Sequence, residues 1–568
     1  MSVSNNNKKS IIIRESKASF SRIILTGFVS LTLGVTLSLS SLPTYADAIG
    51  PLSQQDRAKE AFKLRLKAAE KNFSEKLPAH PHNKDEVKFN NKINSYTKGL
   101  PHDSNGIVDD DAYEALLKAL KSGKNKDFDG IPMGVGDLKL RNPQAAYSYF
   151  LEGKDSHTFK MPKAPGFSSA YQASEAMEVM WQALTRDVSF VDYNNDSTIQ
   201  DAADDMSNMS DFRGPKHNGA VTPQTLFRGI GVGETNGPYI SQFLLQPIPY
   251  GAMTVEQKFN VPVDGNDHLT DYAEWLNIQR GGAASGITTV EFQDEPRYLY
   301  NGRALAQYVL KDFVSQGYLG ATRIIRGYGS AAYDPNDPYK GAAAEARSPL
   351  FGNNHALDFI GRVSMGSQNV AWFQKWLVHR RARPEVFFGR VHNHLTKPSI
   401  FYPIHKDVLN SPAMALVKEK FDSYLLPTAT PVGSPLHPTY PAGHAVMAGA
   451  AVTMLKAFFN GDFVIPNPVM PNADGTALVP YVAPVGEAPL TIDGELNKLG
   501  SNISIGRDTA GVHYRGDGDH GMALGEKYAI SVLRELVKTY NEDFNGFTLN
   551  KFNGNSILIS NKGITKLN

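Results

Sequence analysis

Residues 437–459 read HPTYPAGHAVMAGAAVTMLKAFF, which is a turn-rich octet followed by a long apolar run. The run from Ala445 to Phe459 has the length and spacing of an apolar helix. Pro441 and Gly443 stand at its start, where the first backbone N–H groups of a helix have no intrahelical partner. Gly443 also lets a ligand approach the backbone closely, so this helix start predicts a site for an anion.

Apolar residues recur at helical spacing in other parts of the chain, while alternating, strand-like runs are few and short. The sequence therefore predicts an all-α fold. The further predicted helices are Gln54–Lys76, Ala112–Lys121, Ser168–Thr185, Gly302–Gln316, Gln368–His379 and Met522–Tyr540. Stretches rich in Gly, Pro, Asn and Asp, at residues 333–340 and 465–494, predict long loops between helices.

The chain shows no internal repeat, low-complexity tract or sharp change in composition after residue 48. One large helical domain built around helix bundles is the simplest interpretation, although two packed bundles would give the same pattern. We divide it into an N-terminal helical half, residues 49–300, and a C-terminal helical half, residues 301–568, which carries the three motifs described below.

The composition excludes several classes of function. The 568 residues are 41% hydrophobic, which is enough for a large buried core. Lys and Arg total 58 against 57 for Asp and Glu, so we expect neither a basic surface for nucleic acid nor a polybasic membrane anchor. Cysteine is absent, which excludes disulfides, thiolate metal sites and a cysteine nucleophile.

The N-terminal residues have the pattern of an export signal. Basic residues precede the uncharged, apolar stretch Ile23–Leu42, and the small residues Ala46 and Ala48, which suit cleavage, follow it. We therefore predict a signal peptide at residues 1–48 and a secreted or periplasmic protein; an uncleaved anchor is the alternative. No second apolar segment of spanning length follows, so no membrane contact is expected after removal of the signal.

The first of three polar motifs is KWLVHRRARP at residues 375–384. Pro384 disfavours helix at Arg383, which predicts that the preceding helix ends there. Lys375 and Arg383 are two four-residue steps apart, so they would lie near one helix face and form a wide cationic clamp. The alternative is a solvated basic helix end that complements the helix dipole.

The second motif is the octet at residues 437–444 itself. His444 falls in the first turn of the predicted helix and could act as an acid or a base on an anion bound there. His437 would approach the same anion from the loop. A structural or solvent-exposed role is the alternative for a histidine near a helix start, and both roles stay open.

The third motif is RDTAGVHYRGD at residues 507–517. If the chain is helical from Gly511 onward, Asp517 lies one turn from His513 and accepts the proton of one ring nitrogen. That bond would fix the tautomer and leave the other nitrogen free to bind a metal. The glycines of this segment lower its helix propensity, so a plain surface loop is the alternative.

In this chain order, the three motifs resemble the signature of the vanadium haloperoxidase and phosphatidic-acid-phosphatase superfamily. The chain is similar to its haloperoxidase branch, the algal and cyanobacterial bromoperoxidases, outside the motifs as well. The similar stretches are Lys98–His102, Thr225–Gly229, Gly237–Leu245 and Ala510–Tyr514. The resemblance implies the all-α fold of vanadium haloperoxidases and acid phosphatases, with the vanadate-binding core in the C-terminal half.

The resemblance implies a vanadium-dependent bromoperoxidase. Such an enzyme oxidises bromide or iodide with hydrogen peroxide to hypohalous acid, which halogenates small organic acceptors. The expected partners are therefore hydrogen peroxide, the halide and the organic acceptor, together with further copies of the chain in a homo-oligomer.

The resemblance also implies one vanadate per subunit. In the family, three cations and a backbone N–H bond the oxygens of this anion, because an unpaired buried charge would be costly, and one histidine binds vanadium. The matching residues are Lys375, Arg383, Gly443, Arg507 and, as the ligand to the metal, His513. Asp517 would lie behind His513 and hold its ring.

Catalytic roles follow from the same resemblance. His444 would take a proton from hydrogen peroxide, and Lys375 would polarise the peroxide. His437 matches a catalytic histidine near the path of the halide. Trp372, one helical turn before Lys375, matches a residue that lines the halide cavity; packing in the core is the alternative for this side chain.

Two other functions stay open. An acid phosphatase of the same superfamily would use the same pocket, with His513 as nucleophile and His444 as acid. A non-catalytic secreted protein that merely retains the pocket is the second alternative. The family usually has Ser where this chain has Ala442, and the lost hydroxyl donor, a loss of about 1 to 3 kcal/mol if nothing replaces it, predicts weaker retention of vanadate.

A calcium site has less support in the sequence. Residues 192–198, DYNNDST, resemble the start of a calcium loop, but Gly is missing at the sixth position and Glu at the twelfth. A solvated, turn-rich loop is favoured, and calcium stays a possibility without a clear motif.

Overall fold

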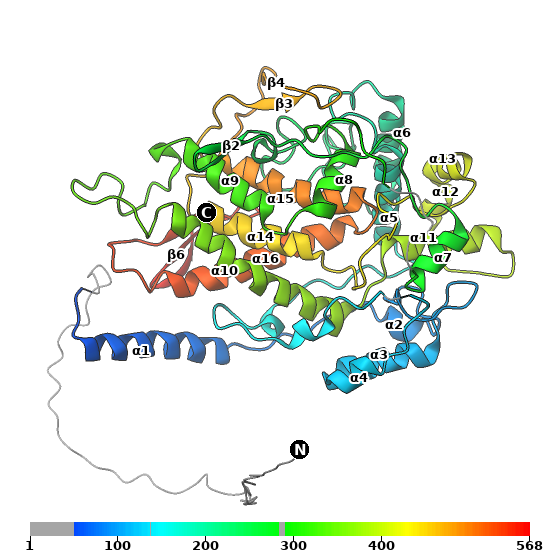
Figure 1. Ribbon diagram of the computed structural model, residues 1–568, viewed down its shortest axis with the longest axis horizontal. Coiled ribbons are helices and arrows are strands. Elements are labelled where there is room, and N and C mark those ends of the chain that lie inside the picture. Colours follow the sequence, from blue (N-terminus) through cyan, green and yellow to red (C-terminus); the bar gives the residue numbers. More distant parts are fainter. Residues whose placement is uncertain (1–49, 137, 283–289, 568) are drawn as a thin grey trace, which may run out of the picture. The chain divides into compact units, whose positions relative to one another are not determined.

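The computed structural model describes residues 50–136, 138–282 and 290–567 (Figure 1). The predicted signal peptide, residues 1–48, lies outside the described residues. The α-helices in these ranges are α1 (Gln54–Phe73), α2 (Asp85–Lys88), α3 (Asp110–Ser122), α4 (Asn125–Asp129), α5 (Ala170–Leu184), α6 (Ser197–Asn208), α7 (Tyr272–Gln279), α8 (Gly302–Lys311), α9 (Gln316–Gly327), α10 (Asn353–Trp372), α11 (Pro384–Thr396), α12 (Lys406–Asn410), α13 (Pro412–Phe421), α14 (Gly443–Lys456), α15 (Ile492–Thr509) and α16 (Arg515–Leu536).

Other regular elements are short. The 3-10 helices are η1 (Pro143–Tyr147), η2 (Ser156–Thr158), η3 (Gln242–Leu244) and η4 (Ser330–Ala332), and η5 (Phe373–His379) is a π-helix. The strands are β1 (Ile248–Tyr250), β2 (Met253–Val255), β3 (Val469–Pro471), β4 (Leu478–Pro480), β5 (Phe547–Asn550), β6 (Ser556–Ser560) and β7 (Gly563–Lys566).

The strands pair antiparallel in three small sheets, in the orders β1-β2, β3-β4 and β5-β6-β7. In the last of these, Phe547 of β5 lies opposite Ile559 of β6. The predicted all-α class is therefore confirmed, because the strands form only three small sheets at the side of a mainly helical structure. Within the part of the chain that the structure describes, the helices lack the combined length and hydropathy that would let one cross a bilayer.

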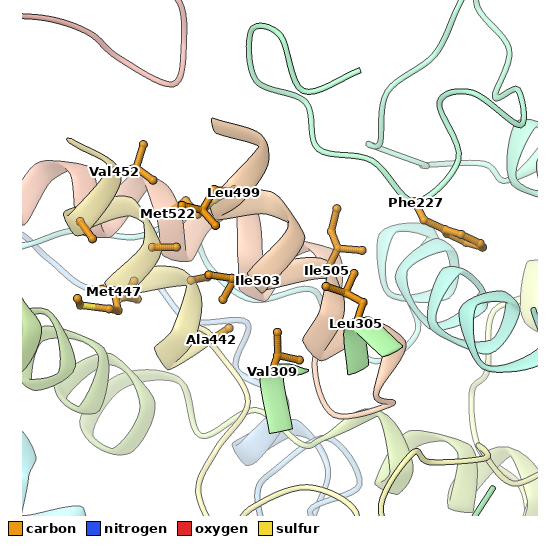
Figure 2. Close-up of a cluster of buried hydrophobic side chains, with 14 of the residues drawn as sticks. Phe227, Leu305, Val309, Ala442, Met447, Val452, Leu499, Ile503, Ile505 and Met522 are labelled. Atoms are coloured by element: carbon orange, nitrogen blue, oxygen red, sulfur yellow. The ribbon is translucent and has the colours of Figure 1, made fainter. Parts of the chain in front are cut away.

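Helix α14 lies at the centre of the core and packs against α10, α15 and α16. Every residue of α14 except His444 is buried, as expected of a helix that is apolar on all sides. Figure 2 shows Met447 and Val452 of α14 close to Leu499 of α15 and Met522 of α16. The apolar run that opened the sequence analysis therefore forms the middle of the bundle.

Two glycines let α14 and α16 cross at close range. A Cβ atom built on Gly449 would lie 2.0 Å from the carbonyl oxygen of Met522, and one built on Gly525 would lie 2.0 Å from that of Val446. A larger residue at either position would force the two backbones apart. A hydrogen bond of 2.9 Å from the backbone N–H that precedes α14 to the carbonyl of Asp517 joins the beginnings of the two helices.

Helix α5, which belongs to the N-terminal half of the chain, is part of the same core. It is buried along almost its whole length and packs against α12, α13 and α15 of the C-terminal half. A separate apolar cluster around α3 includes Trp376 of η5. The described residues, from 50 onward, form one compact unit, and the division at residue 300 stays a prediction.

The seven predicted helices are present with shifted ends, and α15 is the longest of several helices that were not predicted. Residues 465–494 have the composition of a loop, whereas β3 and β4 lie within that stretch and α15 begins at Ile492. Polar residues conceal the periodicity of α15, because they are buried as well. Lys498, for example, is paired with Glu495 at 2.6 Å inside the core.

Candidate functional site

The residues of the three motifs meet at one place beside the beginning of α14. Lys375 comes from η5, Arg383 from the residue before α11, and Arg507 from the last turn of α15. His513 stands in the short link between α15 and α16. Each of these side chains reaches the site from a different element, so the site depends on the packing of the whole bundle.

The expected single helix face for Lys375 and Arg383 is wrong. Helix α10 widens into η5 after Trp372, and the chain then turns at Arg380 with a φ of 40°. Pro384 begins α11 and does not end the earlier helix, so Arg383 is the residue immediately before a new helix. The two cations are brought together by the turn between the helices and not by helical spacing.

Backbone carbonyls hold the three cations in place. The Nζ of Lys375 donates to the carbonyls of Pro438 and Thr439 at 2.7 and 2.9 Å. The Nη1 of Arg383 donates to the carbonyl of Val512 at 2.7 Å. These contacts tie the octet 437–444 and the link before α16 to the first motif.

Arg507 is the third buried cation. Its Nη1 donates to the carbonyl of Val309 at 2.7 Å, while its Nε is buried and has no hydrogen-bond partner within the described structure. Lys375, Arg383 and Arg507 are 0%, 0% and 6% exposed, which means that their charges are almost entirely removed from water. Such burial is costly for a cation that is not balanced by an anion.

None of the carboxylates in the described ranges lies within 4.0 Å of a nitrogen of these three cations, whereas buried arginines such as Arg381 and Arg515 have carboxylate partners. Burial, followed by the charge of Arg507, lowers the pKa of Arg383 to about 10. Burial also lowers the pKa of Arg507 to about 10. The pKa of Lys375 is lowered well below its usual value by burial and then by Arg383. The three cations therefore have no carboxylate in direct contact, which suits an anionic ligand.

His513 is held in one tautomer. Its Nε2 lies 2.9 Å from the Nη1 of Arg383, and a guanidinium can only donate, so Nε2 carries a lone pair. Its Nδ1 then bears the proton and donates to the Oδ2 of Asp517 at 3.0 Å, with the hydroxyl of Thr439 at the same distance. Burial and then Arg383 lower the pKa of His513 well below its usual value, so the ring is neutral and can bind a metal.

The predicted contact between His513 and Asp517 is present, but the predicted helix from Gly511 is wrong. Gly511 has a φ of 81° and follows the end of α15, and α16 starts only at Arg515. Asp517 accepts a hydrogen bond from the N–H of Tyr514 at 3.1 Å and so caps α16. It reaches His513 from the first turn of the helix, and the link stays extended enough to aim the ring at the site.

The first turn of α14 presents backbone N–H groups to the site. Ala442 is the N-cap residue and makes no side-chain cap bond. The carbonyl of Gly443 accepts from the Nε2 of Gln368 at 3.0 Å. A Cβ atom built on Gly443 would lie 3.0 Å from the Oε1 of Gln368 and 3.2 Å from the ring of Trp372, so this position is tightly packed.

His444 is the one residue of α14 that is not buried, and Asp312 orients it. Its Nε2 lies 2.9 Å from the Oδ1 of Asp312, the residue after α8. A carboxylate accepts this proton, so the Nδ1 of His444 carries a lone pair and can act as a base. Burial lowers the pKa of His444, while the bond to Asp312 acts in the opposite direction.

Three residues of the site, Asp312, Thr439 and Gln368, were not predicted from the sequence. Asp312 lies 132 residues before His444 and inside a predicted helix, where no spacing marks it. Thr439 carries a hydroxyl in the motif octet, and that hydroxyl was a signal that could have been followed. Gln368 lies one helical turn before Trp372 and so faces the same side of α10.

Trp372 lies between His437 and a cavity. The rings of Trp372 and His437 are 4.9 Å apart, and the Nζ of Lys375 lies 5.9 Å from the indole. The Nη2 of Arg383 lies 3.0 Å from the Nδ1 of His437. Trp372 packs against both apolar clusters and also lines a cavity of about 780 Å³, so neither of its two predicted roles excludes the other.

The stretch that resembles a calcium loop begins a helix. The side chain of Asp196 accepts from the N–H of Ile199 at 2.9 Å and caps α6. Among the described residues, no group of His, Asp and Glu side chains has the arrangement of a metal site.

Known proteins resemble this chain over most of its length. Residues 369–542 match the family described as the VCPO second helical-bundle domain. The chain is 33% identical to the vanadium-dependent bromoperoxidase of Ascophyllum nodosum, over 92% of this chain and 95% of that protein. It is 32% identical to the vanadium-dependent bromoperoxidase of Corallina pilulifera, over 89% of this chain and 99% of that protein.

A solved structure shows the same fold. The homohexameric second vanadate-dependent bromoperoxidase of Ascophyllum nodosum superposes with a TM-score of 0.86 at 30% sequence identity, covering 94% of this chain and 96% of that chain. The similarity therefore includes the N-terminal half of the chain as well as the part that carries the motifs.

Proposed function

The chain belongs to the family of vanadium-dependent bromoperoxidases, and we propose that its buried cations and His513 hold one vanadate per subunit. The protein is an enzyme that acts on hydrogen peroxide and oxidises bromide or iodide to hypohalous acid, which halogenates organic compounds. One observation carries the proposal for the site. Lys375, Arg383 and Arg507 are buried together, and no carboxylate oxygen of the described residues lies within 4.0 Å of their nitrogens.

The donor set fits vanadate, a tetrahedral anion whose charge the three cations would balance. Lys375 uses two of its three N–H donors on carbonyls, and the Nε of Arg507 is unused, so both side chains have a donor for an oxygen of the anion. The N–H of Gly443 lies at the beginning of α14, where the helix dipole favours negative charge. The lone pair on the Nε2 of His513 would bind vanadium.

The residues of the chain then have separate tasks. Bound vanadate supplies a Lewis acid that activates hydrogen peroxide without a change in its own oxidation state. His444 takes the proton of hydrogen peroxide at Nδ1, while its Nε2–H stays with Asp312. Lys375 donates a hydrogen bond to a peroxide oxygen and so withdraws charge from it. Burial of the site excludes water, which strengthens each of these contacts.

A dye assay with three halides tests the function. We expect bromination of a phenol-sulfonephthalein dye to require orthovanadate and peroxide, with bromide and iodide as good substrates and chloride as a poor one. A smaller halide loses more hydration on entry and is harder to oxidise, and the uncharged indole of Trp372 offers it no cation. Hydrolysis of nitrophenyl phosphate with no bromination would instead support an acid phosphatase.

Ala442→Ser is expected to bind vanadate about tenfold more tightly. Ala442 is fully buried at the N-cap of α14, where a hydroxyl can accept from the N–H of His444 or Ala445 and donate to an oxyanion. The same cap bond should raise the free energy of unfolding by about 1 kcal/mol. Titration of vanadate-free protein with orthovanadate and thermal unfolding measure the two effects. Equal or weaker affinity would show that another group already serves that oxygen.

We also propose that the chain assembles with copies of itself, as the second bromoperoxidase of Ascophyllum nodosum does in its homohexamer. Helix α1 supports an interface, because none of its residues is buried. Phe62, Leu66 and Phe73 share one side of α1 and are 64%, 42% and 93% exposed. Contact with a second copy would remove this apolar surface from water.

The double variant Phe62→Glu/Leu66→Glu is expected to form smaller particles than the unchanged protein, because charge on this face opposes burial. Analytical ultracentrifugation measures the change. Lys67→Glu alters the net charge by the same amount on another face of α1 and serves as the control. An unchanged particle mass in the double variant would remove α1 from the interface.

Export of the protein is a further part of the proposal. It rests on the sequence alone, on the apolar stretch Ile23–Leu42 and the small residues after it. N-terminal sequencing of the mature protein tests it, and we expect cleavage after Ala46 or Ala48.

A further inference from the structure

A cavity of about 780 Å³ shares a wall with the proposed vanadate site. Trp372 and Gln368 of α10 form that wall. On its other side, Gln368 donates to the carbonyl of Gly443 at 3.0 Å, and the indole of Trp372 lies 4.9 Å from the ring of His437. The cavity therefore lies directly against two residues that contact the proposed site.

The wall is fixed by backbone contacts before any ligand arrives. The indole N–H of Trp372 donates to the carbonyl of Arg141 at 3.0 Å. The N–H of Arg141 donates to the carbonyl of Leu436 at 2.9 Å, next to the motif octet. Asn369 donates to the carbonyls of Ala145 and Ser148 at 2.6 and 2.8 Å, which holds η1 and the residue after it against α10.

The lining combines apolar side chains with positive charge. Leu138, Leu140, Phe150, Met365 and Leu436 make most of it apolar. Apolar surface continues beside the cavity. Tyr149 and Leu151, the chain neighbours of the lining residue Phe150, are 83% and 100% exposed.

Two cations, Lys139 and Arg141, also line the cavity, and the lining contains neither Asp nor Glu. Both side chains are exposed, and within the described ranges no carboxylate oxygen lies within 4.0 Å of either. Arg141 makes its hydrogen bonds to Trp372 and Leu436 through its backbone, so its side chain remains available to a ligand. An apolar ligand with a negative group fits this combination of surfaces.

We propose that this cavity binds the organic acceptor, and that the acceptor is an electron-rich aromatic compound with an acidic group, such as a phenol that carries a carboxylate. The inference rests on the proposed function and names the substrate class for the same site. A cavity of this volume has the usual size of a small-molecule pocket, and apolar walls with a few placed polar groups are typical of one. The aromatic ring would stand beside Trp372, and the carboxylate would lie near Lys139 and Arg141.

The bromination step in the cavity balances as follows. The enzyme's established reaction oxidises bromide by two electrons with hydrogen peroxide, which gives hypobromous acid and water once a proton is taken up. A ring carbon of the acceptor attacks the bromine atom, so that a carbon–bromine bond forms and the bromine–oxygen bond breaks. The hydroxide that leaves takes the ring proton and becomes water. The overall reaction consumes the aromatic compound, hydrogen peroxide, bromide and one proton, and yields the brominated aromatic compound and two waters.

A competition experiment separates binding from bromination in free solution. An equimolar mixture of 4-hydroxyphenylacetate and 4-hydroxyphenylacetamide is brominated once by the vanadate-loaded enzyme and once by reagent hypobromous acid. We expect the enzyme to favour the carboxylate over the amide about fivefold more than the reagent does, because two cations attract only the carboxylate. A product ratio equal to that of the reagent would overturn the proposal.

Two variants and a control sharpen this result. Ser148→Trp should fill the cavity, and Lys139→Gln/Arg141→Gln should remove its charge; both should return the product ratio to that of the reagent. Lys562→Gln removes a charge from the exposed turn between β6 and β7 and should leave the ratio unchanged. A cavity variant that keeps the full preference of the unchanged enzyme would overturn the proposal, whichever of the two shows it.

Bromide-dependent release of oxygen from hydrogen peroxide, measured without any organic acceptor, reports on the proposed function alone. We expect the unchanged enzyme to release oxygen, and Lys562→Gln to release it at the same rate. If the unchanged enzyme releases no oxygen, the proposed function fails. If it releases oxygen but shows the product ratio of the reagent, the function stands and the acceptor site fails.

Discussion

His513→Ala is expected to abolish stoichiometric vanadate binding. His513 would be the only protein ligand to the metal, and its Nε2 lone pair is presented by the bond from Nδ1 to Asp517. The three cations remain in the variant and would still attract the anion, so we expect weak, salt-sensitive binding that is at least about 100-fold poorer, a difference of about 2.7 kcal/mol. Dialysis after reconstitution with orthovanadate, followed by metal analysis, measures the loss.

The control removes a buried imidazole elsewhere. His355 is 6% exposed, stands in the first turn of α10 and bonds Phe351 and Tyr540. His355→Ala should lower the thermal stability and retain one vanadium per subunit. If His513→Ala also retains tight, stoichiometric vanadium, the assignment of the metal ligand is wrong.

His444→Ala is expected to bind vanadate nearly as well as the unchanged protein and to lose bromide oxidation by about 10² to 10⁴-fold. His444 contributes no charge at neutral pH, because burial lowers its pKa, and the anion therefore loses little when the ring is removed. The proton of hydrogen peroxide, however, loses its acceptor. Turnover at saturating peroxide and bromide, on protein shown to be loaded with vanadate, measures the effect.

Two companion measurements distinguish a base from a structural residue. Added imidazole should restore part of the turnover of His444→Ala, because a small base can enter the space that the ring leaves. Asp312→Asn removes the carboxylate that keeps the proton on Nε2, so it should lower turnover and shift its pH profile while vanadate stays bound. Near-normal turnover in His444→Ala would show that another group takes the proton.

The parts of the site that local chemistry determines could be predicted from the sequence. Pro441 and Gly443 mark a helix start wherever the helix lies, and the four-residue interval between His513 and Asp517 brings the two side chains together even though the helix begins later than expected. The helices with a clear apolar spacing were found for the same reason. In each case the signal lies within a few neighbouring residues.

Features that depend on distant contacts could not be predicted. Asp312 meets His444 only because α8 and α14 come together in the folded bundle, and a single sequence does not carry that pairing. The π-helix η5 follows an ordinary helical pattern, so Lys375 and Arg383 were placed on one face of a helix that in fact ends between them. Helix α15 was missed because its buried polar residues, such as Glu495 and Lys498, satisfy one another within the core.

The glycines of α16 show why propensity alone misleads. They lower the intrinsic tendency of this segment to form a helix, which favoured a loop in the sequence analysis. In the folded protein they allow contacts that no other residue would permit: a Cβ atom on Gly516 would lie 2.2 Å from the Oε1 of Glu175, and one on Gly518 would lie 2.1 Å from the Oγ of Ser504. Tertiary packing therefore decides the conformation here.

The crossing of α14 and α16 fixes the spacing between His444 and His513, the proposed proton acceptor and metal ligand. His444 stands on the first turn of α14 and His513 two residues before α16. The contact that sets the gap between the helices lies at Gly449, about 7.5 Å further along α14 than His444. A methyl group added at Gly449 or Gly525 would push the backbones of α14 and α16 apart. It would thereby increase the distance between His444, the proposed proton acceptor, and His513, the proposed metal ligand. The distance between these two histidines can thus be changed by a substitution at a position that contacts neither the anion nor the halide.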